Sequence, residues 1–385
     1  MYTISDYGAM IADTARTQAF FRALRAAITP DSIVVDIGAG TGIFSLLACR
    51  LGARRVYAIE PDDAIQVAKA MAVANGCSDR IEFTQDLSTN ISLPERADVM
   101  VSDIGGVLPW FRNHITSIVD GRRRFLAPDG VLIPRRDTAW LAVVEAEDWY
   151  AQQTAPLKNK GLEIDMEAAW NIVSNTFNRT NVKCQHLLTE VRHWTSVDYA
   201  DVENPDVRGT AEWSVQRRGV GHGLALGFDR VLAPGVRISN APSTPRKINA
   251  GRTYSPILLP WSMPVALAAG DRVIVHLEAV LAGEDYIWNW KTSVRGGRSG
   301  AEKARFVQST FFGVPLSAAR LRKRGASYRP TLNEDGRIAR FVLDSMNQCT
   351  PVGEIARQLS YEFTDRFKDP KDTLSYVADL AQKYG

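Results

Sequence analysis

Short apolar runs alternate with helical periodicity through the first third of the chain. The runs are four to five residues long, and the segments between them carry apolar residues three or four positions apart. The predicted strands span residues 33–37, 56–59, 81–84, 99–102 and 130–133. Predicted helices span residues 13–27, 63–74 and 111–125, and a further helix follows the first strand. This alternation predicts an α/β domain with a doubly wound parallel sheet.

The pattern changes near residue 137, where apolar and polar positions begin to alternate with period two. Such segments occur at residues 139–144, 210–215 and 273–281, separated by glycine and proline turns. They predict an antiparallel β domain. Residues 161–183 are less regular, and we expect them to project from this domain as an arm.

Helical periodicity returns near the end of the chain. It covers residues 338–346, 352–363 and 371–382, behind a polar turn. We therefore expect a small separate helical module. The predicted domains are residues 1–136, 137–326 and 327–385.

The turn after the first predicted strand reads GAGTG, with glycines at Gly38, Gly40 and Gly42. Glycines at this place bring backbone close to a ligand, and a carboxylate at Glu60, after the second strand, can bind both ribose hydroxyls. A dinucleotide fingerprint requires glycine where this chain has Ile43. A nucleoside without phosphates, a nicotinamide or flavin nucleotide, and a structural unit with an unused turn all remain open.

Composition narrows the class of protein. The 385 residues include 46 basic and 43 acidic side chains, a near balance that gives no electrostatic case for a nucleic-acid partner. The four cysteines match neither zinc spacing nor a disulfide framework, and the five histidines show no ligand spacing, so no metal is predicted. The start of the chain lacks a charged leader, and no long apolar run is present. We expect a cytoplasmic protein without membrane contact.

The first two predicted domains resemble the protein arginine methyltransferases, which have a class I methyltransferase fold. The resemblance lies in YGAMIADTARTQAF at residues 7–20, VVDIGAGTGIFSLLACRLGARRVYAIE at 34–60, VMVSDIGG at 99–106 and LAPDGVLIP at 126–134. It implies S-adenosylmethionine as cofactor, a Rossmann-like domain followed by a β-barrel, and a homodimer formed through the arm at 161–183.

The resemblance also implies roles for single residues. Met10 would line the sulfonium, Arg16 would pair with the cofactor's carboxylate, and Glu60 would hold the ribose. Asp86 or Leu87 would border the adenine. The motif that forms the rest of the cofactor site comprises Asp36, Gly38, Gly40 and Gly42.

Departures from the family concern the substrate. The family grips a guanidinium with two glutamates; here Asp103 takes the first position and Arg112 the second. The family's Thr-His-Trp loop corresponds to Leu259-Pro260-Trp261. A guanidinium would be poorly compensated by one short carboxylate. We therefore expect another amine as acceptor, oriented by Asp103, with Asp13 as the second catalytic carboxylate; the alternative is that both aspartates only cap helices.

Tryptophans supply a further expectation. Ring faces attract cations, so these side chains would form a wall around a cationic product, although core or dimer contacts would equally explain them. The four candidates are Trp110, Trp261, Trp288 and Trp290.

The last predicted domain is similar to PqqD-like winged-helix domains. The similar stretch is LNEDGRIARFVLDSMNQCTPVGEIARQLSYEF at residues 332–363, followed by DTLSYVADLAQKYG. The resemblance implies recognition of the leader of a ribosomally synthesised and modified peptide, bound as an added strand on an exposed edge. A helical cap that completes the barrel core is the alternative.

Together these features predict an S-adenosylmethionine-dependent N-methyltransferase that modifies an amine of a precursor peptide recruited through its leader. Methyltransferases of daptide-type clusters fit this description. Three other functions stay open: an arginine methyltransferase with a rebuilt pocket, a non-catalytic peptide-binding scaffold, and an O-methyltransferase acting on a carboxylate.

Overall fold

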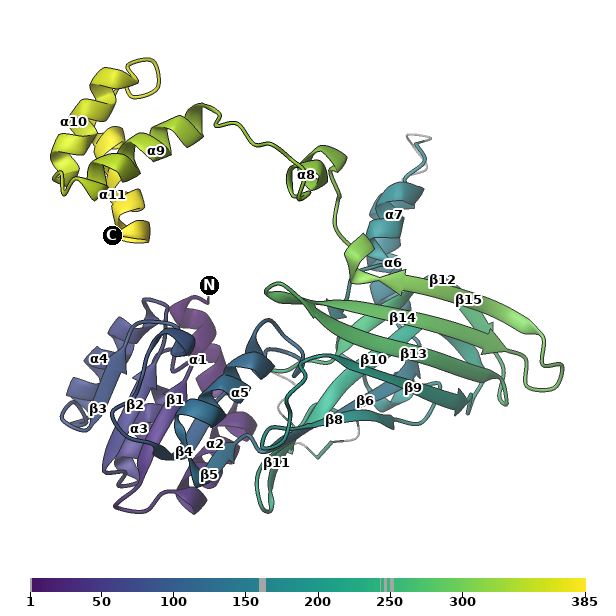
Figure 1. Cartoon of the computed structure of the whole chain (residues 1–385). Helices are drawn as coiled ribbons and strands as arrows, with labels where there is room; N and C mark the ends of the chain where they lie inside the picture. The colour runs from purple at the N-terminus through teal and green to yellow at the C-terminus, as the bar shows by residue number, and fades with distance from the viewer. Residues whose placement is uncertain (1, 159–163, 243, 246–247, 250–252) are drawn as a thin grey trace. The chain divides into compact units, whose positions relative to one another are not determined.

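The structure is a computed structural model that describes residues 2–158, 164–242, 244–245, 248–249 and 253–385 (Figure 1). The chain divides into two compact units, Met1–Pro315 and Leu316–Gly385. The first unit holds both the parallel sheet and the antiparallel sheets. The finer domain limits at residues 136 and 326 stay predictions.

A five-stranded parallel sheet opens the first unit, in the order β3-β2-β1-β4-β5. Its strands are β1 (Ile33–Ile37), β2 (Arg55–Ile59), β3 (Ile81–Thr84), β4 (Ala97–Ser102) and β5 (Leu126–Ile133). Every residue of β1 is buried, as expected for a central strand covered on both faces. The strand order reverses between β1 and β4, and open α/β sheets bind ligands at the carboxyl ends of the strands at such a point.

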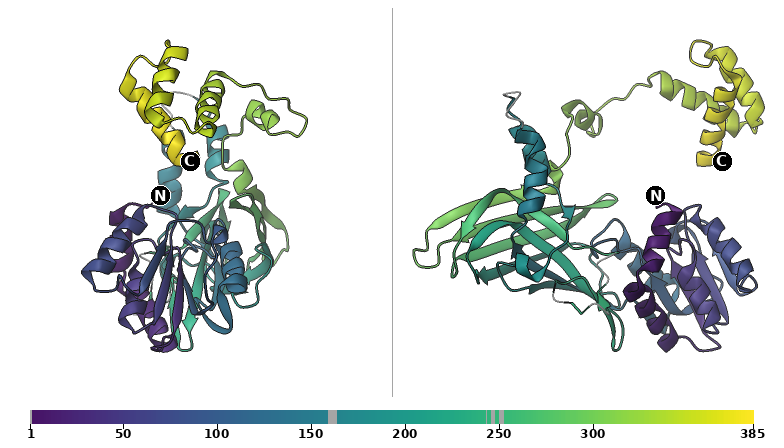
Figure 2. Two further views of the ribbon diagram at one scale, coloured as in Figure 1. Left: turned by 60° about the vertical axis from the view of Figure 1, so that its left-hand side comes forward. Right: turned by 180° about the vertical axis from the view of Figure 1, so that it is seen from behind.

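Helices cover both faces of this sheet (Figure 2). They are α1 (Ile4–Ala12), α2 (Thr14–Ala27), α3 (Ile43–Arg50), α4 (Ala64–Ala74) and α5 (His114–Arg124). The predicted alternation of strands and helices is confirmed. The last of these helices begins three residues later than predicted, because the preceding segment is a turn-rich loop that contains Gly106 in the left-handed region.

The rest of the first unit forms antiparallel sheets, which confirms the predicted β domain. One sheet has the order β7-β12-β10-β6-β8, with β11 paired to β10, and the other has the order β15-β14-β13-β9. The strands are β6 (Arg136–Val144), β7 (Asn178–Arg179), β8 (Arg192–Asp198), β9 (Val207–Ser214), β10 (Gly219–Ala233), β11 (Val236–Ser239), β12 (Ile257–Leu267), β13 (Arg272–Ala282), β14 (Asp285–Arg295) and β15 (Glu302–Ser309). Among the described residues the pairing leaves two separate sheets, so the expectation of a closed barrel is wrong.

Two helices interrupt the antiparallel domain where the sequence pattern predicted no helix. They are α6 (Glu147–Thr154) and α7 (Glu167–Val173), and α7 extends away from the sheets (Figure 1). Trp170 of α7 contacts β12, because its indole Nε1 donates to the carbonyl of Ser262 at 2.7 Å. The predicted arm includes residues 161–163, which lie outside the described residues, and its role in dimerisation stays a prediction. Short 3₁₀ helices lie at Ser88–Asn90, Pro156–Lys158, Cys184–His186 and Thr310–Phe312.

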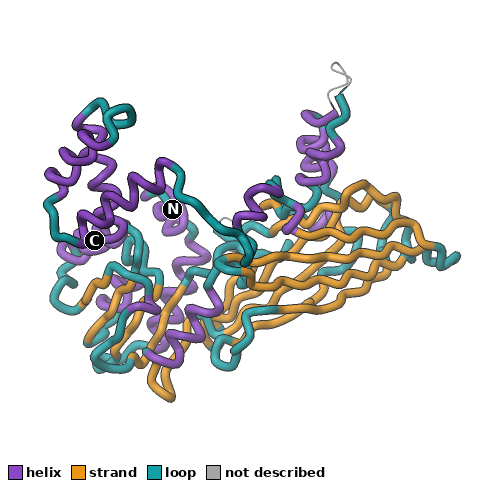
Figure 3. Tube along the Cα trace, turned by 45° about the horizontal axis from the view of Figure 1, so that its top comes forward, coloured by secondary structure: helices purple, strands orange, loops and turns teal. Residues whose placement is uncertain are grey.

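The second unit is entirely helical (Figure 3). It contains α8 (Ala318–Lys323), α9 (Glu334–Asn347), α10 (Val352–Glu362) and α11 (Pro370–Tyr384). Its own core consists of Ile338, Val342, Ile355, Ala356, Leu359 and Val377. The predicted helices are confirmed, but residues 316–385 contain no strand, so this unit has no strand edge to which a peptide can add.

Two features are absent from the described part of the chain. No helix there combines the length and apolar character that crossing a membrane requires. No cluster of three or more histidine, cysteine or acidic side chains in the described part of the chain is arranged to hold a metal ion.

Candidate functional site

The glycine turn between β1 and α3 takes a conformation that requires glycine. Gly38, Gly40 and Gly42 have φ of +76°, +55° and +79°. A side chain at Gly38 would place its Cβ 2.1 Å from Cγ2 of Ile104. The turn therefore keeps its backbone bare at the carboxyl end of β1.

Glu60 follows β2 and reaches back to this turn. Its carboxylate oxygens accept hydrogen bonds from the backbone N–H groups of Gly40 at 2.8 Å and Asp62 at 2.9 Å. Burial raises the pKa of Glu60, and these two hydrogen bonds oppose that shift. Each carboxylate oxygen can accept a further bond, which suits a pair of ribose hydroxyls.

Asp36, the fourth residue of β1, carries an unsatisfied acceptor. Its Oδ2 accepts from the Ser45 hydroxyl at 2.7 Å, whereas its buried Oδ1 has no hydrogen-bond partner among the described residues. Burial raises the pKa of Asp36 to about 7. A buried orphan acceptor beside bare backbone and the carboxylate of Glu60 fits a nucleoside ligand that brings hydrogen-bond donors.

Replacing Gly40 with alanine tests the turn. The new Cβ would lie 2.5 Å from Cε1 of Tyr7, at a positive φ. We expect the free energy of unfolding to fall by about 1–2 kcal/mol, the usual penalty of left-handed backbone for a residue with a Cβ. Urea unfolding measures it. Gly8→Ala is the matched control: Gly8 lies within α1 with nothing within 4 Å of its Cβ position, so alanine there is expected to stabilise by up to about 1 kcal/mol. Equal effects at both positions would contradict the assignment.

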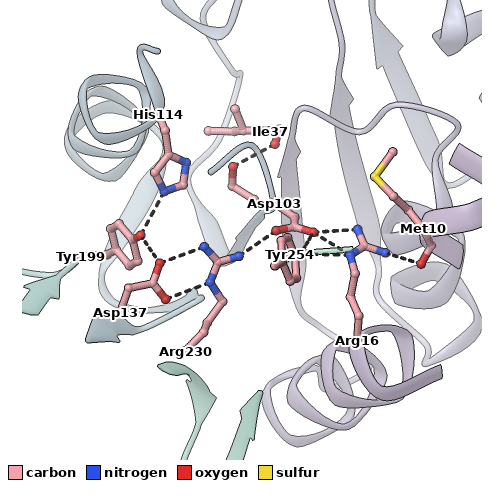
Figure 4. A network of polar contacts seen from close by, with 10 residues as sticks. Met10, Arg16, Ile37, Asp103, His114, Asp137, Tyr199, Arg230 and Tyr254 are labelled. Carbon is pink, nitrogen blue, oxygen red and sulfur yellow. Dashed lines mark hydrogen bonds and ion pairs between the residues drawn. The ribbon is translucent and has the colours of Figure 1, made fainter. Parts of the chain in front are cut away.

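Asp103 lies just beyond β4, on the same rim of the sheet, at the centre of a buried polar network (Figure 4). Arg16 of α2 donates to its Oδ2 through Nε at 2.8 Å and through NH2 at 2.7 Å. The Tyr254 hydroxyl also donates to Oδ2. From β10, Arg230 donates to Oδ1 through NH1 at 2.8 Å. The side chain of Asp103 is only 6% exposed.

These neighbours determine the charge of Asp103. Burial alone would raise its pKa, but the Arg16 and Arg230 guanidinium groups and the Tyr254 hydrogen bond outweigh burial and hold the pKa below its ordinary value. The pKa of Tyr254 is raised, first by burial and then by the charge of Asp103. The site thus holds an ionised aspartate and a neutral tyrosine.

The network continues into the antiparallel domain. Arg230 binds both oxygens of Asp137, through Nε and NH2, each at 2.8 Å. Asp137 accepts a further bond from the Tyr199 hydroxyl at 2.6 Å, and that hydroxyl lies 3.0 Å from Nε2 of His114. Burial, followed by the charge of Arg230, lowers the pKa of His114 to about 4.

His114 gives a pH-dependent prediction. Because an unfolded histidine has a pKa near ~6.5, the unfolded chain takes up a proton below that pH that the folded protein does not. The contribution of His114 to stability is therefore present above about pH 6.5 and declines as the pH falls toward 4. We expect the difference in free energy of unfolding between wild type and His114→Gln to fall by about 2 kcal/mol from pH 7 to pH 5.

Urea unfolding at the two pH values measures this difference, and the comparison cancels contributions from other groups such as Asp36. His193→Gln, a substitution at an exposed histidine, reports the effect of the chemical change alone. A difference for His114→Gln that stays constant between pH 7 and pH 5 would show that this histidine is not kept neutral by burial.

The structure brings together some of the residues predicted on α1 and α2. Arg16, predicted to pair with a cofactor carboxylate, is bonded to Asp103, to Tyr254 and to the carbonyl of Met10 at 3.2 Å. Asp13 caps α2 and accepts bonds from the N–H and hydroxyl of Thr253, at 3.1 and 2.8 Å. Asp13 thus holds the loop before β12 against the start of α2.

The adenine-side candidates lie on the same rim, after β3. Asp86 accepts bonds from the backbone N–H of Leu87 at 2.6 Å and from the Asn90 amide at 2.8 Å. The side chain of Leu87 is 54% exposed. An exposed apolar side chain beside the rim is available to contact a base. The assignment of Asp86 and Leu87 to the adenine stays a prediction.

The four tryptophans are core residues rather than the wall of one space. All are at most 2% exposed. Trp110 makes an edge contact with Trp288, at 6.2 Å between ring centroids, whereas Trp261 stacks on Phe306 at 5.4 Å. Trp290 donates to the side chain of Gln308 at 3.0 Å. The structure does not gather these four rings around an acceptor.

Arg112 stands apart from the network around Asp103. It is exposed, has φ of +43°, and its guanidinium lies over the Phe111 ring at 5.4 Å from the centroid. No hydrogen bond joins it to the described residues around Asp103. The cations that contact Asp103 are instead Arg16 and Arg230.

Sequence reasoning missed the residues that the antiparallel domain contributes. Leu259, Pro260 and Trp261 lie inside β12, and the polar groups that reach the site come from Thr253 and Tyr254, ahead of that strand. A signal for Arg230 exists: it is a lone cation in the mostly buried strand GVGHGLALGFDRVLA, and a buried cation requires a partner.

Comparisons with known proteins agree with this architecture. A profile of the ribosomal protein L11 methyltransferase (PrmA) family matches residues 13–135. The chain is 28% identical over 247 residues to a probable protein arginine N-methyltransferase 6 of Arabidopsis thaliana, covering 62% of this chain and 55% of that protein. It is 36% identical over 124 residues to protein arginine N-methyltransferase 1 of Schizosaccharomyces pombe, covering 32% and 36%. The chain thus spans about half, or less, of these relatives.

Solved structures show the same fold. Protein arginine methyltransferase 10 of Arabidopsis thaliana matches with a TM-score of 0.69 at 19% identity, over 80% of this chain and 98% of that one. The PRMT1 enzyme-prozyme heterotetrameric complex of Trypanosoma brucei with AdoHcy matches with a TM-score of 0.70 at 20% identity, over 79% and 97%. A Rossmann-like parallel sheet followed by an antiparallel β domain, as in these proteins, is confirmed.

Proposed function

We propose that the protein is an S-adenosylmethionine-dependent N-methyltransferase. The observation that carries the proposal is the meeting of the bare glycine turn, Glu60 and Asp103 at the carboxyl ends of adjacent strands, where the strand order reverses. Similarity to arginine methyltransferases and to the PrmA family supports the choice of cofactor. Glu60 would hold the ribose and Asp36 Oδ1 would accept a donor of the bound nucleoside.

When bound, S-adenosylmethionine supplies a methyl group activated by its sulfonium. The protein's task is to align a nitrogen lone pair with that group and to exclude water. An amine attacks only in its neutral form, and burial favours that form. Asp103 would accept a hydrogen bond from an amine N–H and so orient the lone pair, whereas its lowered pKa makes it a poor base.

The proposed acceptor is an amine of a ribosomally made precursor peptide of the daptide type, recruited through Leu316–Gly385. The proposal rests on the resemblance of the stretch at residues 332–363 to PqqD-like domains, and this unit has a core of its own. Because the unit has no strand, we propose that the leader binds to its helical surface. Recruitment would raise the local concentration of the peptide at the site to roughly millimolar values.

Removing the second unit separates recruitment from chemistry. A protein ending at Pro315 is expected to bind S-adenosylhomocysteine as the full chain does, because every residue assigned to the site lies before that point. Its KM for a precursor peptide should rise about a hundredfold, the scale of tethering effects, with kcat little changed. Mass spectrometry of peptide incubated with S-adenosylmethionine provides the assay. Equal KM values for both proteins would contradict leader recruitment.

Substrate comparison addresses the other functions. Methylation of free arginine or histone-like peptides in preference to a precursor amine would favour the arginine methyltransferase function. A product that loses its methyl group in mild base would indicate an ester and O-methylation. If calorimetry detects leader binding but no heat with S-adenosylmethionine, the protein is a scaffold.

A further inference from the structure

Arg230 occupies a guanidinium-binding site within its own chain. The guanidinium, which is fully buried, donates to both oxygens of Asp137 and to Oδ1 of Asp103. Its central carbon lies 4.8 Å from the ring centroid of Phe228 and 5.3 Å from that of Tyr254. Arginine is recognised in proteins by a carboxylate that accepts two parallel hydrogen bonds from the guanidinium, by further carboxylates and by aromatic rings.

The backbone next to Asp103 is shaped to admit this guanidinium. A Cβ at Gly105 would lie 3.0 Å from NH2 of Arg230. Any side chain at that position would force the arginine or the loop to shift. The buried guanidinium of Arg230 therefore packs closely against the segment that carries Asp103.

The charges in the network are already balanced. Two buried guanidinium groups, of Arg16 and Arg230, face two buried carboxylates, of Asp103 and Asp137. Asp13, the other buried aspartate near Arg16, is engaged by Thr253 and by the backbone N–H of Arg16. A cationic acceptor beside Asp103 would add a third positive charge to this network, whose two carboxylates are already paired, and an uncompensated buried charge is strongly unfavourable.

Asp103 retains capacity for one neutral donor. Its Oδ2 accepts from Arg16 and Tyr254, and its Oδ1 accepts from Arg230 alone among the described residues. A carboxylate oxygen has two lone-pair directions, so Oδ1 can take one further N–H bond. This capacity matches a single N–H of an uncharged amine and not the forked edge of a guanidinium.

We propose that Arg230 is a resident guanidinium that fills the cation-binding place beside Asp103, so that the acceptor is bound uncharged and arginine side chains are excluded. Arg230 is thus a specificity-determining residue that acts through Asp103. The proposal rests on the proposed function, in which Asp103 faces the acceptor.

The test uses the full-length chain and methylguanidinium chloride as the probe, with and without S-adenosylhomocysteine. Arg230→Ala empties the place of the guanidinium and leaves both carboxylates. This variant is expected to bind the probe at millimolar concentration and to gain several degrees in melting temperature at about 10 mM probe. Wild type and Arg237→Ala, a control at an exposed arginine of β11, are expected to show no shift.

Arg230→Ala leaves the buried carboxylate of Asp137 without its ion-pair partner, which could destabilise the fold. A second variant therefore removes this unpaired charge. Arg230→Ala with Asp137→Asn removes one charge of each sign and keeps the vacated space. It is expected to bind the probe more weakly than the single variant but more tightly than wild type. Folding of each variant is checked by circular dichroism.

Two results would overturn the proposal: folded variants that do not bind methylguanidinium, or wild type that binds it as tightly as they do. Because the readout is probe binding, it does not require methyl transfer. Absence of S-adenosylhomocysteine binding in the same samples would instead refute the proposed function and would leave the result on Arg230 standing.

Discussion

Replacing Glu60 with alanine is expected to weaken S-adenosylmethionine binding by about a hundredfold or more. The carboxylate supports the turn through Gly40 and, in the proposed complex, holds two ribose hydroxyls. Hydrogen bonds to charged groups contribute about 1.5–3 kcal/mol each, and about 1.4 kcal/mol corresponds to tenfold in affinity. Isothermal titration calorimetry with S-adenosylmethionine or sinefungin measures the change.

Glu82→Ala is the matched control, because Glu82 is an exposed acid on the neighbouring strand β3. The Glu82→Ala variant should bind S-adenosylmethionine with the affinity of wild type. If Glu60→Ala also retains the wild-type affinity, the ribose is not held at the end of β2 and the assignment of the cofactor site fails.

Asp103→Asn is expected to have the second large effect, on both stability and activity. The substitution leaves two buried guanidinium groups without their shared carboxylate, and breaking such a buried ion pair costs about 3–5 kcal/mol. We expect methyl transfer to a peptide amine to fall by about a hundredfold or more, the scale found when one oriented polar group is removed from an active site.

Urea unfolding and single-turnover methyl transfer, measured on the same preparation, separate the two effects. Asp98→Asn, at an exposed position of the same strand whose side chain accepts one backbone N–H, is the control for the chemical change. A variant at Asp103 that is folded and transfers methyl groups at the wild-type rate would remove this residue from the mechanism.

The parallel sheet and its ligand-binding rim follow from local sequence. Short apolar runs followed by amphipathic segments determine strand and helix within about 30 residues, the scale of one β-α-β unit. The ends of those runs place Glu60 and Asp103 on one rim without knowledge of tertiary contacts. Glycine at three positions of the turn is likewise a local requirement, which the positive φ values confirm.

The partners of Asp103 could not be predicted in the same way. Period-two alternation in the antiparallel domain identifies strands but gives neither their pairing nor their register. The closed barrel was implied by the family resemblance alone, and the described strands form two separate sheets instead. The resemblance places the family's Thr-His-Trp loop at Leu259-Pro260-Trp261, which lies inside β12. The residue that reaches Asp103 is Tyr254, which precedes that strand. The four tryptophans are buried, in line with the alternative that large aromatic side chains fill cores more often than they form cages.

The second unit shows the limit of a short resemblance. Apolar spacing predicted α9, α10 and α11, because each must cover the small core they share. The exposed strand edge that the resemblance to winged-helix domains implies is absent, because residues 316–385 contain no strand.

The bonds to Asp103 span long stretches of the chain. Its partners Arg16, Arg230 and Tyr254 are 87, 127 and 151 positions away. Closing loops of this length carries an entropic cost that only a nearly complete native structure repays, and contacts distant in sequence slow folding. We therefore expect the polar centre to form late in folding, and a fragment that stops after the parallel sheet to expose Asp103 and Arg16 to water rather than reproduce the site.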